Sequence, residues 1–195
     1  MIEISGLCKS YEGKKVLDNF SCALPERGVV LVEGRSGAGK TTLMNILMGL
    51  REPDAGRITG MENRRVTAVF QENRLIENLS VMKNIRLACG RQATDAEIAA
   101  QLAAVGLAGE EKTIVSTLSG GMKRRVALVR AVMAPGDVLM LDEPFKGLDD
   151  QTKDMAVAYV RGHADGRLVL LVTHDPSEAR ALNAEKTISI GMEEA

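Results

Sequence analysis

The sequence has few aromatic residues and no tryptophan, and neither sign of charge is in excess. Aromatic residues make up 3% of the 195 residues, and 25 Lys and Arg stand against 26 Asp and Glu. There is no basic excess to favour nucleic acid, and there is little aromatic material for base-stacking platforms. We therefore expect no nucleic-acid partner.

Cysteines and long apolar runs are also scarce. Cys8, Cys22 and Cys89 lie far apart, with no metal-binding or redox spacing, which favours reduced thiols in the cytosol. The longest run of strongly apolar residues, Leu168 to Val172, is far too short to span a membrane. The first residues lack the basic-then-apolar pattern of a secretion signal. These features predict a cytoplasmic protein.

Apolar residues are nevertheless abundant, at 45% of a chain whose length suits one domain. Runs typical of strands alternate with helical patterns, which predicts an α/β fold with a mainly parallel, helix-covered sheet. Between about residues 74 and 134 helical patterns dominate, including a capping box at Thr94–Glu97, so we expect an inserted helical subdomain there. The expected strands are Met1–Tyr11, Val16–Leu24, Val29–Val32, two short strands within Gly56–Phe70 of which the second is Val66–Phe70, Val138–Leu141, Leu168–Thr173 and Lys186–Ile190. The clearest expected helices are Leu43–Leu50, Ser80–Cys89, Gly121–Ala134, Gln151–Arg161 and Pro176–Leu182.

The strongest chemical signal is a glycine-rich segment with the spacing G-x-x-x-x-G-K-T, between an apolar strand and a helix. Glycines let backbone N–H groups converge on phosphate oxygens, and the helix N-terminus adds the positive end of its dipole. Lys40 can reach the β- and γ-phosphates of a nucleotide, and the Thr41 hydroxyl can hold Mg²⁺. The segment predicts a phosphate-binding loop made of Gly34, Arg35, Ser36, Gly37, Ala38, Gly39, Lys40, Thr41 and Thr42.

An acidic pair lies about a hundred residues further on. The apolar run Val138–Leu141 ends in Asp142 and Glu143, at the carboxyl end of a buried strand, where ligands bind in parallel sheets. Asp142 can hold the Mg²⁺ shell, as a second acid does in P-loop NTPases. Glu143 could polarise an attacking water as a general base. Taken alone, such a pair is as well explained by a helix cap or a turn.

A third element narrows the family. Leu118–Met122 places a serine and two glycines ahead of a helix, and Pro144 follows the acidic pair. With the phosphate loop in the same order, the sequence resembles ABC-type ATPases over nearly its whole length. The resemblance implies that Glu143 is the catalytic base, assisted by Gln71 and His174. It also implies that Gln71 joins Thr41 and Asp142 around the metal, that Tyr11 stacks on adenine, and that Ser119, Gly120, Gly121 and Asp149 contact nucleotide.

Several expectations follow from the resemblance alone. The fold would be a P-loop NTPase parallel-sheet core with a small antiparallel β lobe and the inserted helical subdomain, as a single domain over residues 1–195. ATP and Mg²⁺ would be the ligands. In this family, Ser119 and Gly121 would act on the nucleotide held by the other subunit, so the chain would form a head-to-tail homodimer that sandwiches two ATP. An integral-membrane permease subunit would be the second partner, placing the protein at the inner face of the cell membrane.

The segment Phe70–Val81, with Asn84, looks like ATPases of nitrate, sulfonate, taurine and pyrimidine-precursor importers. An importer would also work, indirectly, with a solute-binding protein. Met122 replaces the usual Gln of the family signature, and Lys146-Gly147 stand where Ser-Ala is usual. The alternatives are an exporter ATPase, a non-transport ABC ATPase acting on DNA or ribosomes, and a P-loop kinase or GTPase. The last two are disfavoured because the chain has no long coiled-coil insertion, tandem cassette or N-K-x-D tetrapeptide.

Overall fold

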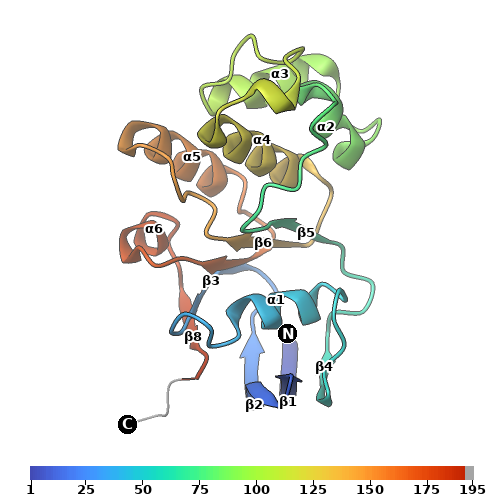
Figure 1. Ribbon diagram of the computed structural model, residues 1–195, viewed down its shortest axis with the longest axis vertical. Helices are drawn as coiled ribbons and strands as arrows, with labels where there is room; N and C mark the ends of the chain where they lie inside the picture. Colours follow the sequence, from blue (N-terminus) through green and yellow to red (C-terminus); the bar gives the residue numbers. More distant parts are fainter. Residues whose placement is uncertain (192–195) are drawn as a thin grey trace.

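Five parallel strands form the central sheet of the computed structural model, which describes residues 1–191 (Figure 1). In spatial order they are β5 (Val66–Val69), β6 (Val138–Asp142), β7 (Leu168–Val172), β3 (Gly28–Glu33) and β8 (Lys186–Ser189). Every residue of β6 and β7 is buried. This burial on both faces explains why these strands are continuous apolar runs rather than alternating ones.

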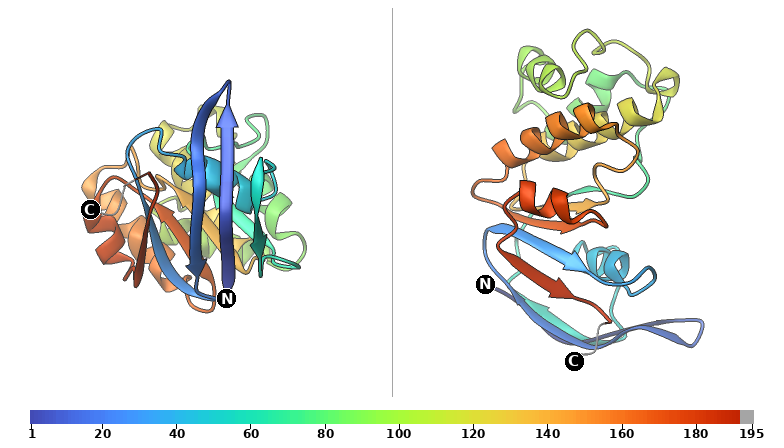
Figure 2. Two further views of the ribbon diagram at one scale, coloured as in Figure 1. Left: turned by 90° about the horizontal axis from the view of Figure 1, so that it is seen from below. Right: turned by 90° about the vertical axis from the view of Figure 1, so that its left-hand side faces the viewer.

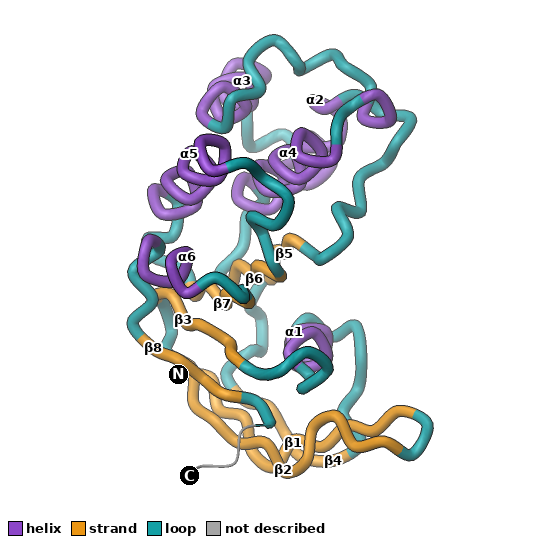
Figure 3. The backbone as a smooth tube through the Cα atoms, turned by 60° about the vertical axis from the view of Figure 1, so that its left-hand side comes forward, coloured by secondary structure: helices purple, strands orange, loops and turns teal. Residues whose placement is uncertain are grey.

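A second, antiparallel sheet lies below one face of the central sheet. Its strands are β1 (Ile2–Tyr11), β2 (Lys14–Leu24) and β4 (Ala55–Thr59), in the order β2-β1-β4. Helix α1 (Lys40–Leu47) lies between the two sheets, as the views in Figures 2 and 3 show. The antiparallel lobe implied by the resemblance is therefore present.

The other face of the central sheet is covered by helices. Helices α2 (Val81–Cys89), α3 (Asp95–Ala104) and α4 (Gly120–Met133) form the upper part in Figure 1, with a 3₁₀ turn at Val115–Thr117. Helix α5 (Asp150–Gly162) lies beside α4, and α6 (Pro176–Ala181) follows β7. None of the helices within residues 1–191 is long and apolar enough to cross a bilayer.

Successive side chains along each strand alternate between the two faces of the sheet, and this alternation divides the core into two clusters. Leu139 and Leu141 of β6 pack with the helices, whereas Val138 and Met140 pack with α1 and the antiparallel sheet. One strand therefore serves both clusters. The sheet is thereby fixed from both sides, and the loops at its edge start from rigid strand ends.

The predicted fold class is confirmed, with differences at the element ends. Helix α1 begins at Lys40, three residues before the apolar run that predicted it, because the phosphate loop itself forms its first turn. The 3₁₀ turn at Val115–Thr117 was not predicted. The single domain over 1–195 and the subdomain limits near 74 and 134 stay predictions, and residues 192–195 lie outside the described residues.

Candidate active site

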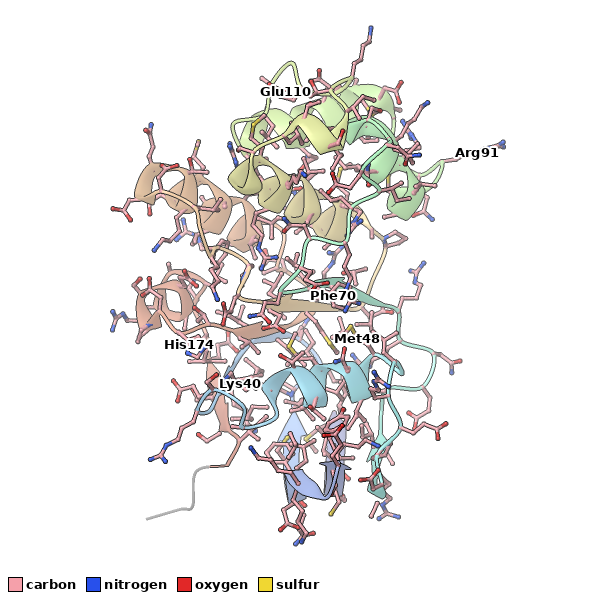
Figure 4. All side chains as sticks on the ribbon, viewed as in Figure 1. Lys40, Met48, Phe70, Arg91, Glu110 and His174 are labelled. Carbon is pink, nitrogen blue, oxygen red and sulfur yellow. The ribbon has the colours of Figure 1, made fainter. Side chains whose placement is uncertain are left out.

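The predicted phosphate-loop, metal and catalytic residues lie at the carboxyl ends of four neighbouring parallel strands. The glycine-rich loop follows β3, Gln71 follows β5, Asp142 ends β6 with Glu143 directly after it, and His174 follows β7. Carboxyl ends of parallel strands share one edge of a sheet, so these segments meet there. They surround a cavity of about 230 Å³ lined by Val16, Ser36, Gly37, Gly39, Lys40, Thr41, Thr42, Gln71, Asp142, Glu143, Val172 and His174. Figure 4 shows Lys40 and His174 on the same side of the molecule.

The glycine-rich loop has a shape that only glycine permits at two positions. Gly39 has a φ of 106°, and a Cβ there would lie 2.8 Å from the Val16 carbonyl oxygen. At Gly34, with a φ of 155°, a Cβ would lie 2.7 Å from the Ile190 carbonyl oxygen. Both are closer than real Cβ atoms approach such an oxygen. Side chains at these positions would force the loop open.

Lys40, at the end of this loop, is the first residue of α1 and is 8% exposed. Its Nζ donates hydrogen bonds to the carbonyl oxygens of Gly34, at 2.7 Å, and of Arg35, at 3.1 Å. The ammonium group is thus held at the mouth of the loop by neutral acceptors. No carboxylate of the described residues lies within ion-pair distance of it. It therefore remains available for an anionic ligand.

Thr41 and Asp142 form the floor of the cavity, because the Thr41 hydroxyl donates to Asp142 Oδ2 at 3.0 Å. Burial raises the pKa of the Asp142 carboxyl, and the neighbouring Glu143 charge raises it further, whereas Thr41, Arg124 and Lys40 oppose that rise. In residues 1–191 no cluster of three or more His, Cys, Asp or Glu side chains could hold a metal alone. Mg²⁺ fits such a site, since it commonly takes one or two protein oxygens together with waters and substrate phosphates.

Glu143 is paired through both of its carboxylate oxygens. Its Oε2 lies 2.6 Å from the Nζ of Lys146, and its Oε1 lies 3.2 Å from the Nε2 of His174. The hydrogen bond from Lys146 is the main cause that lowers the pKa of Glu143, with smaller contributions from the charges of Lys146, His174 and Arg124. The backbone of Glu143 has a φ of 48°, an uncommon conformation for a residue with a side chain. The carboxylate is therefore ionised and held in place.

Other predicted residues lie outside this cavity. Tyr11 is 38% exposed at the end of β1, with the Nζ of Lys9 5.8 Å from its ring centroid. Ser119 caps helix α4, accepting a hydrogen bond from the Met122 amide at 3.2 Å, and Asp149 caps α5. The glycines that follow Ser119, Gly120 and Gly121, form the first turn of α4. Ser119, Gly120 and Asp149 are exposed, and none of the residues in this group lines the cavity.

Two structurally important side chains were not assigned roles from the sequence. Asn84 is 1% exposed and bonds both the amide and the carbonyl of Ile76, so it shapes the loop before α2. Arg124 is 4% exposed and hydrogen-bonds the loops after β5 and β6. The helical spacing of the sequence could have predicted that Arg124 is buried, because Arg124 shares a helix face with Leu128 and Val132, four and eight residues later.

The fold and the cavity define a P-loop nucleotide-binding domain. Residues 17–146 match the sequence profile of the family described as "ABC transporter". The chain is 41% identical over 188 residues to an aliphatic sulfonates import ATP-binding protein of Rhodococcus jostii, covering 93% of this chain and 75% of that protein. It is 38% identical over 179 residues to a thiamine import ATP-binding protein of Rhizobium meliloti, covering 84% and 75%. This chain belongs to the ABC transporter family, and it is an ABC ATPase.

Two further similarities bear on the narrower expectations. A taurine import ATP-binding protein of Yersinia pestis is 36% identical over 201 residues, covering 95% of this chain and 78% of that protein. A solved dimeric structure of an ATP-binding cassette, in a post-hydrolysis state with ADP and Pi, aligns with a TM-score of 0.83 and 25% identity, covering 97% of this chain and 94% of that one. The predicted resemblance to sulfonate and taurine importer ATPases is thereby confirmed. The roles of the individual site residues stay predictions.

Proposed function

We propose that this chain is the ATPase subunit of a membrane importer for a small anion or small organic solute. In this proposal it acts as a homodimer on the inner face of the cell membrane. It hydrolyses Mg-ATP at the cavity described above and drives a permease that receives its solute from a solute-binding protein. The observation that carries the proposal is the convergence of Lys40, Thr41, Gln71, Asp142, Glu143 and His174 on one cavity from four neighbouring strand ends.

The side chains around the cavity have the chemistry that phosphoryl transfer to water needs. Lys40 would exchange its carbonyl partners for the β- and γ-phosphate oxygens. Glu143 would accept a proton from the water that attacks the γ-phosphorus, and the bond from that phosphorus to the bridging oxygen breaks to leave ADP. His174, on the other carboxylate oxygen, would orient the base. Mg²⁺, held by Thr41 and Asp142, would supply neutralisation of phosphate charge.

The chain on its own offers only part of such a site. Ser119, Gly120 and Gly121 present a capped helix N-terminus, a favourable place for phosphate, away from the cavity that holds Lys40. A head-to-tail dimer would bring this helix end to the partner's nucleotide. The dimeric solved relative with ADP and Pi supports this arrangement.

The permease would bind where the loop before α2, together with α2 itself, leaves apolar side chains in contact with solvent. Ile76 is 44% exposed and Leu87 64% exposed, whereas Leu75 and Met82 are half-buried against the core. This surface begins within a few residues of Gln71, so a movement there can reach the cavity. The solute itself would not contact this chain, and relatives named for sulfonate, taurine and thiamine import match it at similar identity.

A pair of substitutions tests the proposal. Lys40→Ala should abolish Mg-ATP binding, because it removes the cation at the mouth of the loop. Glu143→Gln should keep binding but lose turnover by roughly 10²-fold or more, since it removes only the base. Calorimetry measures the binding, and phosphate release measures turnover.

The two variants control for each other, because both retain the fold but fail at different steps. Glu143→Gln should also accumulate as an ATP-bound dimer in size-exclusion chromatography with Mg-ATP. Near-normal affinity in folded Lys40→Ala would contradict the phosphate-loop assignment, and wild-type turnover in Glu143→Gln would move the base elsewhere, first to His174.

A further inference from the structure

Arg124 carries a buried positive charge. It lies on α4, five residues after Ser119, and is 4% exposed. Within the described part of the chain, no carboxylate lies within ion-pair distance of its guanidinium group. Burying a charge is costly unless it is well hydrogen-bonded, so its contacts must compensate for the lost water.

Those contacts are carbonyl groups from two loops of the candidate site. On the β6 side, Nε donates to the Pro144 oxygen at 3.0 Å, and Nη2 donates to the oxygens of Asp142, at 2.7 Å, and of Glu143. On the β5 side, Nη1 donates to the oxygens of Phe70 and Gln71 and to Asn73 Oδ1. Phe70, labelled in Figure 4, lies below α4. One side chain thus joins three segments.

The β6 side of this junction holds an unusual backbone turn. Three successive carbonyls, from Asp142 to Pro144, converge on one guanidinium group, and Glu143 in the middle has a φ of 48°. A residue with a side chain adopts this conformation only where its surroundings hold it. A planar guanidinium with five N–H donors can satisfy these acceptors together, whereas a lysine presents its donors from one point.

We propose that Arg124 is a positioning residue for hydrolysis, which fixes the backbone of Glu143 and Gln71 relative to the helix that begins at Ser119. The inference rests on the proposed function, because it assigns Glu143 the role of base. Arg124 does not contact nucleotide in this scheme. It acts through the position of the Glu143 carboxylate, and it links each chain's own base to the helix end that serves its partner's nucleotide.

The test compares Arg124→Gln with Arg167→Gln in the full-length chain. Arg167 is a partly buried arginine that likewise donates to backbone carbonyls, those of Val132 and Ala134 at the other end of α4, so it is a matched control away from both site loops. Arg124→Gln should lower kcat on the order of 10- to 100-fold, as small misplacements of reacting groups do. Its affinity for Mg-ATP should stay within about threefold of wild type, because Lys40 and the phosphate loop are untouched. Arg167→Gln should keep kcat near wild type.

A double-variant cycle separates positioning from general damage. If Arg124 acts through Glu143, adding Arg124→Gln to Glu143→Gln should cause little further loss, because the group being positioned is already gone. Equal losses of affinity and kcat, or effects that multiply in the double variant, would overturn the proposal, as would an unchanged kcat. Arg124→Lys keeps the positive charge and the aliphatic part of the side chain. If Arg124→Gln does not fold, Arg124→Lys replaces it in the same measurements of kcat, affinity and the double variant.

The outcome is also distinguishable from a failure of the proposed function. If wild-type protein hydrolyses ATP and Glu143→Gln stops it while Arg124→Gln does not, only the positioning role is wrong. If Glu143→Gln hydrolyses ATP as wild type does, the base assignment itself fails.

Discussion

At the scale of single residues, the carboxylate of Glu143 is held by its own chain before any partner arrives. Lys146, in the turn three residues later, takes one oxygen, and His174, from the next strand, takes the other. A carboxylate that accepts both contacts is well oriented, and each of its oxygens keeps a second lone pair that can receive a proton from water. The two contacts can therefore orient the base without blocking it.

Lys146 should determine the acid limb of the pH profile of kcat, the pH below which kcat falls. Its hydrogen bond lowers the pKa of Glu143, so Lys146→Ser should raise that pKa towards the ordinary value. Because protonated Glu143 cannot act as a base, the pH below which kcat falls should then move upward, and this can be measured as kcat at saturating ATP from acid to neutral pH.

Lys146→Arg keeps a cation at the same position and is the matched control, whose acid limb should stay close to wild type. An acid limb that does not move in Lys146→Ser would show that the Lys146 contact is absent from the hydrolysing state.

The sequence predicts the cavity residues better than their contacts. Spacing alone predicts the phosphate loop, because its glycines and Lys40 act within a few residues of one another. The pairing of Glu143 with Lys146 depends on a turn with positive φ, which no local pattern around Asp142-Glu143-Pro144 indicates. The role of Arg124 depends on carbonyls that lie 18 to 54 residues away in sequence, which only the folded chain brings to it.

At the scale of elements, helix α3 shows which structural features a short sequence pattern can predict. The capping box predicted at Thr94–Glu97 is present, with the Glu97 amide donating to Thr94 Oγ1 at 3.2 Å and the Thr94 amide donating to Glu97 Oε2 at 2.6 Å. A capping box satisfies helix-end donors within four residues, so sequence suffices to predict it. The 3₁₀ turn at Val115–Thr117 was missed because its position depends on strand-like contact between Ser80 and Ile114.

Thr94→Ala should destabilise the protein by about 1 kcal/mol, because it removes the cap of α3. For a chain of this size the midpoint of thermal unfolding should fall by roughly 2–4 °C, measured by calorimetry. ATP affinity should not change, since α3 does not line the cavity.

Gln151→Ala, at an exposed position in the first turn of α5, is the control and should shift the midpoint by less. A drop as small in Thr94→Ala as in the control would mean that the α3 N-terminus is already frayed in solution.

At the scale of the whole molecule, the exposed helix end at Ser119 and the cavity around Lys40 are two half-sites on one chain. This arrangement predicts complementation between two inactive variants. The large side chain of Ser119→Arg should prevent contact with the γ-phosphate bound by the partner. Lys40→Ala should prevent ATP from binding to the phosphate loop of its own chain. In a mixed dimer one composite site carries both lesions and the other carries none, so up to roughly a quarter of wild-type ATPase activity should return on equal mixing.

Binding provides the control for this experiment. Ser119→Arg alone should bind Mg-ATP in calorimetry yet fail to dimerise with it in size-exclusion chromatography. If that single variant hydrolyses ATP normally at dilutions where it is monomeric, the two half-sites do not need each other and the dimer proposal is wrong.

The contact between Gly34 and Ile190 has a consequence for how this family's sequences vary. The phosphate loop packs against a main-chain oxygen of the residue after β8, so position 34 requires glycine, while position 190 contributes its backbone to this contact and its buried side chain to the core. The side chain at position 190 is therefore constrained by the core and not by position 34, and the two positions have no reason to change together during evolution. A contact that joins the first and last strands of the catalytic core would thus leave no trace in pairwise covariation.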